Sequence, residues 1–313
     1  MKFIKLITTV TFTFLLINLV NAKEIKMGKA DWDTGYFQAE VYKKALEKMG
    51  YKVVGPTAMK PQVFYVAAAA GDMDLWVNGW FGNHDSYISE AKGKVKPVGY
   101  VAKSGGLQGY LIDKKTADKF NIKSIMDIKK HAKEFDANGD GKADMVACHP
   151  GWGCEKIISK HFKELGLGDF INPIKANYSA AMADIISRYK NGKSILFYTW
   201  TPNWTVGTLK LGTDIVWIEA PFSETKKVSV PNATKAELNM GFGVNDIRPA
   251  ANVDFLKANP KVEKLLNLAS IPLADIASQN LKMNEGEKSE KAIKKHAEEW
   301  IEANQSTFDS WIK

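Results

Sequence analysis

The chain has 313 residues, of which 45% are hydrophobic and 25% charged, and its formal net charge at pH 7 is +8. This length and composition suit two globular lobes with ordinary hydrophobic cores. Basic residues are scattered and interleaved with acidic ones, so the pattern favours a solvated surface, and no nucleic-acid partner is expected.

Residues 1–22 are typical of a secretory signal peptide. Lys2 and Lys5 form a basic n-region, an apolar segment follows from about residue 7 to residue 20, and the segment ends in small residues. A transmembrane anchor is the alternative, but the apolar core is short for one. No cysteine follows that would carry a lipid, so we expect a protein released into the periplasm. Cleavage removes two lysines and no acids, which lowers the net charge from +8 to +6.

The first elements after the signal peptide predict a βαβ unit. Residues 24–33 are typical of a strand that runs into a loop, residues 36–49 repeat apolar side chains with a helical period, and residues 51–54 form a second strand. Asp31 and Trp32 stand at the carboxyl end of the first strand, where open α/β sheets place ligands. A core position for Trp32 is an equal alternative.

A second strand end presents an aromatic and a titratable residue. Residues 63–70 predict a helix of small residues, and residues 72–78 predict a buried strand that leads to Trp80 and His84. If a helix began at Trp80, the two side chains would share one face. A capping or surface histidine is the alternative role for His84.

Two glycine-marked positions indicate where the chain crosses between lobes. Gly105-Gly106 interrupts the pattern in the first half of the chain, and Gly241-Phe-Gly243 does so in the second. The expected α/β lobes are residues 23–104 plus 243–313 for the first and 105–242 for the second.

The remaining predicted elements alternate between strands and helices. Strands are expected at 109–112, 195–199 and 213–220, and helices at 115–133 (in pieces), 154–165, 178–189, 253–268, 275–283 and 285–311. Trp217, Trp300 and Trp311 lie in these segments and are expected to pack in cores.

An acidic, glycine-broken loop in the centre of the chain has the alternation of a calcium loop. The candidate ligands are Asp136, Asn138, Asp140, Lys142 through its backbone carbonyl, and Asp144. The twelfth position is Ala147, so the usual bidentate carboxylate is missing. A solvent-facing turn rich in Asp and Asn is the alternative. The loop is therefore either a structural calcium site or a solvent-facing turn. No cofactor is expected to be required.

A tight turn between two cysteines follows this loop. Cys148 and Cys154 are the only cysteines, and export favours a disulfide over a metal or redox site. The chain-entropy model gives such a small ring about 2–2.5 kcal/mol of stabilisation. Trp152 stands between Gly151 and Gly153, so the backbone can turn sharply and expose its N–H groups and the indole face. The turn is therefore a candidate binding device.

Three tryptophans are expected to sit on turns after strands: Trp80, Trp152 and Trp200. Indole faces bind cations strongly, and several of them can surround a quaternary ammonium group, which has no N–H to donate. Backbone N–H groups at the glycine turn, together with His84, could hold the anion of a zwitterion. Each tryptophan alone is more often a core residue, so the hypothesis rests on the three together.

Four stretches of the sequence match a known family: residues 109–118, 136–155, 177–184 and 197–204. Through them the sequence resembles the glycine betaine/proline betaine substrate-binding proteins of osmoprotectant ABC importers. The resemblance implies a two-lobe, type II periplasmic binding fold that closes on a small methylated ammonium ligand. It also implies an ABC importer permease as partner, and we expect a monomer.

The resemblance also implies site residues. The tryptophan box falls on Trp80, Trp152 and Trp200, the carboxylate contacts fall on His84 and the backbone N–H groups of Gly153 and Cys154, and the disulfide joins Cys148 to Cys154. Trp32 and Glu155 are added as further candidate ligand contacts.

Two stretches depart from the family pattern. Residues 79–84 read Gly-Trp-Phe-Gly-Asn-His where Asn-Trp-Thr-Pro-Leu-His would be expected, and the pair Asp31-Trp32 is unlike the start of the betaine binders. An additional Trp32 could close the box around a smaller ligand, such as trimethylamine N-oxide. Trimethylamine N-oxide and choline are therefore alternatives to glycine betaine.

Functions of other classes are also compatible with parts of the pattern. A secreted enzyme acting on small zwitterions would use His84 and nearby acids, but no nucleophile elbow, zinc motif or Cys–His pair is found, so an enzyme is not expected. A carbohydrate-binding module would also stack its ligand on indoles. Sugar sites need many polar side chains around the ring, and the predicted box lacks them.

Overall fold

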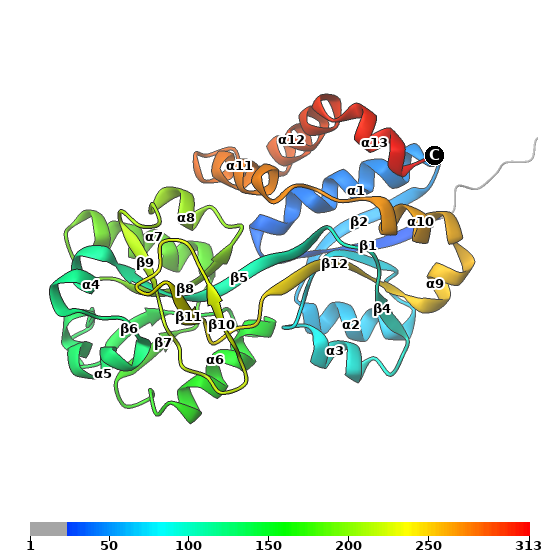
Figure 1. Cartoon of the computed structure of the whole chain (residues 1–313). Coiled ribbons are helices and arrows are strands. Elements are labelled where there is room, and N and C mark those ends of the chain that lie inside the picture. The colour runs from blue at the N-terminus through cyan, green and yellow to red at the C-terminus, as the bar shows by residue number, and fades with distance from the viewer. Residues whose placement is uncertain (1–23) are drawn as a thin grey trace, which may run out of the picture.

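The computed structural model describes residues 24–313, so the predicted signal peptide lies outside the described residues. Figure 1 shows two lobes joined by extended segments. The terminal lobe contains the blue-to-cyan start and the orange-to-red end of the described chain, and the central lobe contains the green and yellow segments. The predicted boundaries, 23–104 with 243–313 and 105–242, serve as labels for the two lobes and stay predictions. Within residues 24–313 no helix combines the length and apolarity needed to cross a bilayer.

The chain opens with the predicted βαβ unit. Strand β1 (Glu24–Ala30) pairs in parallel with β2 (Lys52–Met59), and helix α1 (Tyr36–Lys48) connects them. The apolar stripe of α1, which includes Phe37 and Val41, is buried, as its period predicts. The strand β2 extends five residues beyond the predicted end.

A single path of paired strands runs through both lobes. The order is β2-β1-β3-β12-β5-β8-β6-β7, with β4 paired to β12 and β9 paired to β5. Strands β5 (Ala102–Asp113) and β12 (Asn245–Asn252) are antiparallel neighbours and carry the chain between the lobes (Figure 1).

The other elements of the terminal lobe are α2 (Pro61–Ala70), β3 (Leu75–Phe81), α3 (Asp85–Glu90), β4 (Val95–Pro97), α9 (Val253–Ala258), α10 (Pro260–Leu268), α11 (Leu273–Asn284), α12 (Glu290–Ala303) and α13 (Gln305–Trp311). Those of the central lobe are α4 (Lys114–Phe120), α5 (Ile128–His131), β6 (Ala143–Val146), α6 (Gly153–Glu164), β7 (Ile171–Ile174), α7 (Tyr178–Lys190), β8 (Leu196–Thr201), α8 (Thr205–Thr208), β9 (Ile215–Ile218), β10 (Lys227–Ser229) and β11 (Glu237–Asn239).

Two helices predicted as continuous are broken. The helix expected at 253–268 divides at Asn259 because Pro260 begins α10 and disfavours a helical conformation in the residue before it. The helix expected at 285–311 starts later, after the N-cap residue Ser289, and divides at Asn304.

The pair Gly105-Gly106 does not interrupt a strand, contrary to the expectation. Both glycines lie inside β5, which is continuous from residue 102 to residue 113. A Cβ atom added at Gly106 would lie 2.5 Å from the indole of Trp80, and one at Gly105 would lie 2.9 Å from Leu273. The glycines are therefore required by close packing against the strand, a role that a glycine within a strand commonly has.

Candidate functional site

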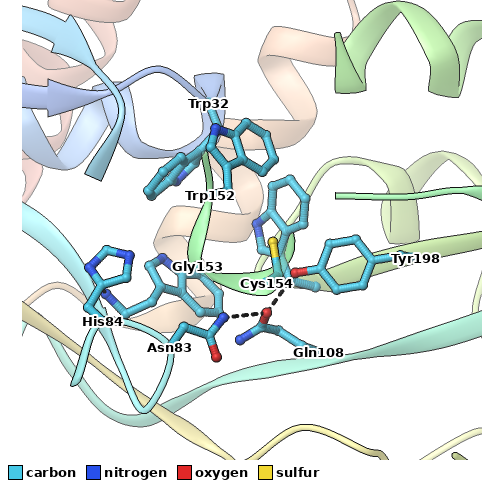
Figure 2. A pocket seen from close by; sticks show the side chains of 10 residues that line it. Trp32, Asn83, His84, Gln108, Trp152, Gly153, Cys154 and Tyr198 are labelled. Carbon is cyan, nitrogen blue, oxygen red and sulfur yellow. Dashed lines mark hydrogen bonds between the residues drawn. The ribbon is translucent and has the colours of Figure 1, made fainter. Parts of the chain in front are cut away.

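A cavity lies between the two lobes and brings together seven of the predicted ligand contacts (Figure 2). Its lining residues are Trp32, Trp80, Asn83, His84, Gln108, Trp152, Gly153, Cys154, Tyr198 and Trp200. Their role in binding stays a prediction, since the structure contains no ligand. Glu155 is outside this lining, and its carboxylate pairs with Lys175 at 2.9 Å.

The tryptophans reach the cavity from different kinds of local structure. Trp152 is the N-cap residue of α6 and lies on a turn, as predicted. Trp80 and Trp200 do not lie on turns; each is the penultimate residue of its strand, β3 and β8 respectively. The strand ladder therefore fixes their backbones more firmly than a turn would.

The indole rings stand at steep angles to one another and so form walls. The ring centroids of Trp32 and Trp152 are 5.2 Å apart at 71°, and those of Trp152 and Trp200 are 5.7 Å apart at 83°. Trp32 also touches the core residue Trp76. Trp32 is therefore packed against the core and also lines the cavity, while its role as a ligand contact stays a prediction.

Every indole N–H of these four tryptophans already has an acceptor in the protein. Trp32 and Trp80 both donate to Oδ1 of Asn78 at 3.1 Å. Trp152 donates to Oδ1 of Asp31 at 2.7 Å, and Trp200 donates to Oγ1 of Thr34 at 3.4 Å. The tryptophans therefore offer the cavity aromatic surface and no free hydrogen-bond donor.

His84 is the N-cap residue of α3, three residues beyond the end of β3, and its ring is neutral. The predicted shared helical face is wrong: a turn brings it back to Trp80, whose backbone N–H points to His84 Nδ1 at 3.3 Å. Nδ1 is thus an acceptor, which leaves the proton on Nε2. Burial lowers the pKa of His84 from its ordinary value to about 3. The residue is a neutral N–H donor at physiological pH.

The start of α6 supplies further donors. Gly153 and Cys154 are its first two residues, so their N–H groups have no intrahelical acceptor, and no side chain caps this end. The positive end of the helix dipole also favours an anion here. A Cβ atom at residue 153 would lie 2.8 Å from the carbonyl oxygen of Asn83, which explains the glycine.

The predicted disulfide is present. Cys148 and Cys154 are bonded, with Cα atoms 5.9 Å apart, and the described chain contains no free cysteine. Gly151 has φ of +91°, as a sharp turn requires. The ring closes the turn that carries Trp152 and so fixes that indole relative to the start of α6.

Three lining residues were missed by sequence reasoning: Asn83, Gln108 and Tyr198. Nδ2 of Asn83 and the hydroxyl of Tyr198 both donate to Oε1 of Gln108, at 2.8 and 2.6 Å. The available signal was Gln108 itself, an amide directly before the apolar run of residues 109–112. Such a buried amide needs partners, and the sequence alone did not say which.

The acidic loop makes its own hydrogen bonds. Asp136 accepts from the backbone N–H groups of Asn138, Gly139 and Gly141, and these bonds hold its pKa below the ordinary value. Asp140 accepts from the backbone N–H of Lys142, and Asp144 accepts from that of Ala137. Within residues 24–313 no group of three or more His, Cys, Asp or Glu side chains is arranged to hold a metal. Calcium binding by the loop stays a prediction.

Comparison with known proteins identifies a family. Residues 23–303 match the family described as the substrate binding domain of ABC-type glycine betaine transport system. The chain is 44% identical over 281 residues to the glycine betaine-binding periplasmic protein OusX of Dickeya dadantii, covering 88% of this chain and 85% of the relative. It is 43% identical over 286 residues to the glycine betaine/proline betaine-binding periplasmic protein of Salmonella typhimurium, with the same coverage of both.

A solved structure shares the fold. Lactococcal OpuAC, crystallised in a closed conformation with glycine betaine, superposes with a TM-score of 0.72 at 20% identity, covering 93% of this chain and all of that one. At this identity the likeness supports the two-lobe architecture alone.

Proposed function

The chain belongs to the family of substrate-binding domains of ABC-type glycine betaine transport systems, and on that premise we propose that it captures glycine betaine or a closely related methylated ammonium compound for import. The predicted family, the two-lobe fold and the periplasmic location are confirmed. What remains to be argued is how this chain's own residues would hold the solute.

The observation that carries the proposal is the cavity walled by four tryptophans whose N–H groups are all engaged elsewhere. A trimethylammonium group has no N–H to donate, so it binds through its charge and its methyl surface. Aromatic faces in a water-poor cavity meet both requirements, because the ring quadrupole attracts the cation and the rings bury the methyl groups. Each of the four side chains is at most 7% exposed.

The donors at the cavity suit a carboxylate. His84 offers a neutral N–H, and Gly153 and Cys154 offer backbone N–H groups at the positive end of α6. Hydrogen bonds to a charged acceptor are roughly twice as strong as neutral ones. A zwitterion with an ammonium and a carboxylate therefore fits better than a simple cation.

Calorimetric titration with glycine betaine, choline, trimethylamine N-oxide and a sulfonium analogue tests the proposal. We expect glycine betaine to bind most tightly of the four. Trp80→Ala, Trp152→Ala and Trp200→Ala should each weaken its binding by about thirtyfold or more, since a desolvated cation–π contact is worth roughly 2 kcal/mol. Trp300→Ala is the matched control because Trp300 packs against Phe37 and Trp311, away from the cavity. Unchanged affinity in two of the three cavity variants would rule out this box.

Trp32 favours a second candidate ligand of the same class. It adds a fourth indole to the cavity, and a smaller body such as trimethylamine N-oxide gains most from an added wall. If the N-oxide binds more tightly than glycine betaine and Trp32→Ala abolishes that preference, trimethylamine N-oxide is the ligand.

The family consists of substrate-binding components of transport systems, so we propose that the protein binds its solute without transforming it. Mass spectrometry should recover each solute unchanged after incubation. We also propose that the protein acts as a monomer that delivers its solute to an ABC importer permease. Light scattering should give the mass of one chain, with or without solute.

A further inference from the structure

Gln108 is a buried amide at the cavity between the lobes. It lies in β5 opposite Trp200 of β8, and it is 2% exposed. Its position in the strand ladder fixes the backbone, and the cavity lies against its side chain. None of the predicted ligand contacts includes this residue.

One end of the Gln108 amide is fully engaged and the other is free. Oε1 accepts hydrogen bonds from Nδ2 of Asn83 and from the hydroxyl of Tyr198, drawn as dashed lines in Figure 2. Nε2 has no hydrogen-bond partner among the described residues. Because two donors from opposite lobes hold Oε1, the amide is oriented and its N–H₂ group is left buried at the cavity wall without an acceptor.

A buried N–H without an acceptor is destabilising, and native proteins rarely leave one without a purpose. The same cavity contains the free N–H of His84 and the free backbone N–H groups of α6. Several donors without acceptors around one cavity favour a ligand that carries an anionic oxygen. The amide would then be satisfied only in the complex.

We propose that Gln108 is a specificity-determining residue, whose Nε2–H donates to an anionic oxygen of the bound solute. This inference rests on the proposed function and adds a discriminating contact to it. A carboxylate accepts a stronger hydrogen bond than the hydroxyl of choline does. Gln108 therefore shifts the preference of the cavity toward carboxylate-bearing trimethylammonium compounds.

Gln108→Glu is the sharpest test, because it keeps an oxygen acceptor for Asn83 and Tyr198 and replaces the donor with a second anionic oxygen. Glycine betaine affinity should fall by at least about tenfold, as expected for loss of a hydrogen bond to a charged group. Choline affinity should change by less than about threefold, since choline has no carboxylate to be repelled. Both are measured by calorimetry.

Gln108→Met is the second variant, in case the buried glutamate prevents folding. It has a similar length and no donor, and it should also lower the betaine-to-choline preference about tenfold. Gln62→Glu, at an exposed position in α2, controls for the added charge and should leave both affinities unchanged. Thermal melting by circular dichroism checks that each variant is folded.

The outcomes separate the two proposals. Wild-type protein that binds glycine betaine, with a betaine-to-choline ratio unchanged in both Gln108 variants, would overturn the role of Gln108 and leave the proposed function intact. An equal loss of both solutes would show that Gln108 only shapes the cavity. Wild-type protein that binds no methylated ammonium solute would overturn the proposed function and this inference with it.

Discussion

Asn78 positions two walls of the cavity with one atom. Its Oδ1 accepts the indole N–H of both Trp32 and Trp80, and the residue is 2% exposed. Asp31, which precedes Trp32, accepts the indole N–H of Trp152 from the central lobe. The pair Asp31-Trp32 therefore has a structural role: Asp31 orients the indole of Trp152, and Trp32 itself forms a wall of the cavity.

The neutral state of His84 leads to a prediction about pH. Because burial lowers its pKa to about 3, the ring stays neutral and keeps Nδ1 as an acceptor for the backbone N–H of Trp80 throughout the range from pH 5 to pH 8. Glycine betaine affinity, measured by calorimetry, should therefore be constant over that range. A loss of affinity between pH 7 and pH 6 would show that His84 titrates near its ordinary value.

The lowered pKa of His84 also predicts how the stability of the protein depends on pH. The unfolded histidine has a pKa near 6.5, so between about pH 3 and pH 6.5 the unfolded state binds more protons than the folded state. The contribution of His84 to stability is complete above pH 6.5 and declines as the pH falls toward 3. Denaturant unfolding of wild type and His84→Asn should show this extra decline in the wild type alone.

Sequence reasoning found the tryptophans and His84 and missed Asn83, Gln108 and Tyr198 for a physical reason. Tryptophans beside glycines at strand ends are recognisable locally, as Trp152 was. Gln108 gains its meaning from Asn83 and Tyr198, which are 25 and 90 positions away. A buried amide whose partners come from distant segments has no local pattern to identify it.

At the scale of elements, the turn from β6 into α6 supplies two of the four proposed hydrogen-bond donors to the anion of the solute, the backbone N–H groups of Gly153 and Cys154. The disulfide between Cys148 and Cys154 closes the turn, and Trp152 and Gly153 lie inside the ring. The helix begins directly after the tryptophan, so its unpaired N–H groups and the indole face reach the same cavity. We therefore expect the conformation of this turn to depend on the disulfide more than the rest of the lobe does.

Removal of the disulfide should therefore affect binding as well as stability. The double variant Cys148→Ser/Cys154→Ser should lose about 2–2.5 kcal/mol of unfolding free energy in the chain-entropy model. Its glycine betaine affinity should fall too, because Trp152 and the N–H groups of α6 become less ordered. Calorimetry and denaturant titration measure the two effects. Two titratable thiols in denatured, unreduced wild type would contradict the disulfide.

The acidic loop gives a prediction about metal removal. The carboxylates of Asp136 and Asp140 accept hydrogen bonds from backbone N–H groups, and we propose that these bonds are enough to hold the shape of the loop. A calcium chelator should leave the melting temperature unchanged, while Asp136→Ala should lower it. A melting temperature that rises with added calcium and returns with chelator would establish the calcium reading instead.

Periodicity located the elements more reliably than their ends. The stripe of α1 was found because apolar residues recur along it, whereas β5 was expected to start near residue 109 and starts at residue 102. Gly105 and Gly106 were expected to interrupt the strand, because nothing in the neighbouring sequence shows that Trp80 packs against Gly106. Breaks at Pro260 and Asn304 follow from local chemistry and could have been assigned from it.

At the scale of the whole molecule, hydrogen bonds between described residues join the lobes around the cavity. Trp152 and Trp200 donate to Asp31 and Thr34 of the terminal lobe, Ser179 donates to Asp33, and Asn83 donates to Gln108. Two of the donors are themselves cavity walls. The walls are therefore complete only when the lobes are together, which couples solute binding to closure.

Closure of the two lobes can be measured directly by solution scattering. If the solute stabilises the joined state, solution scattering should give a smaller radius of gyration with saturating glycine betaine than without it. An unchanged radius at saturation would indicate that the lobes stay together in the free protein.

Asp31 allows closure to be separated from direct contact with the solute. Asp31→Ala removes the acceptor for Trp152 and should lower the population of the closed state, whereas Asp31→Asn keeps an oxygen acceptor and serves as the matched control. Apparent affinity falls in proportion to the closed fraction. Because that fraction is a property of the protein, Asp31→Ala should weaken the binding of glycine betaine and of choline by the same factor, about tenfold or more for one hydrogen bond to a charged group. Gln108→Glu, in contrast, should separate the two solutes. Calorimetry on both variants with both solutes decides the matter: a loss confined to one solute in Asp31→Ala would mean that Asp31 touches the solute.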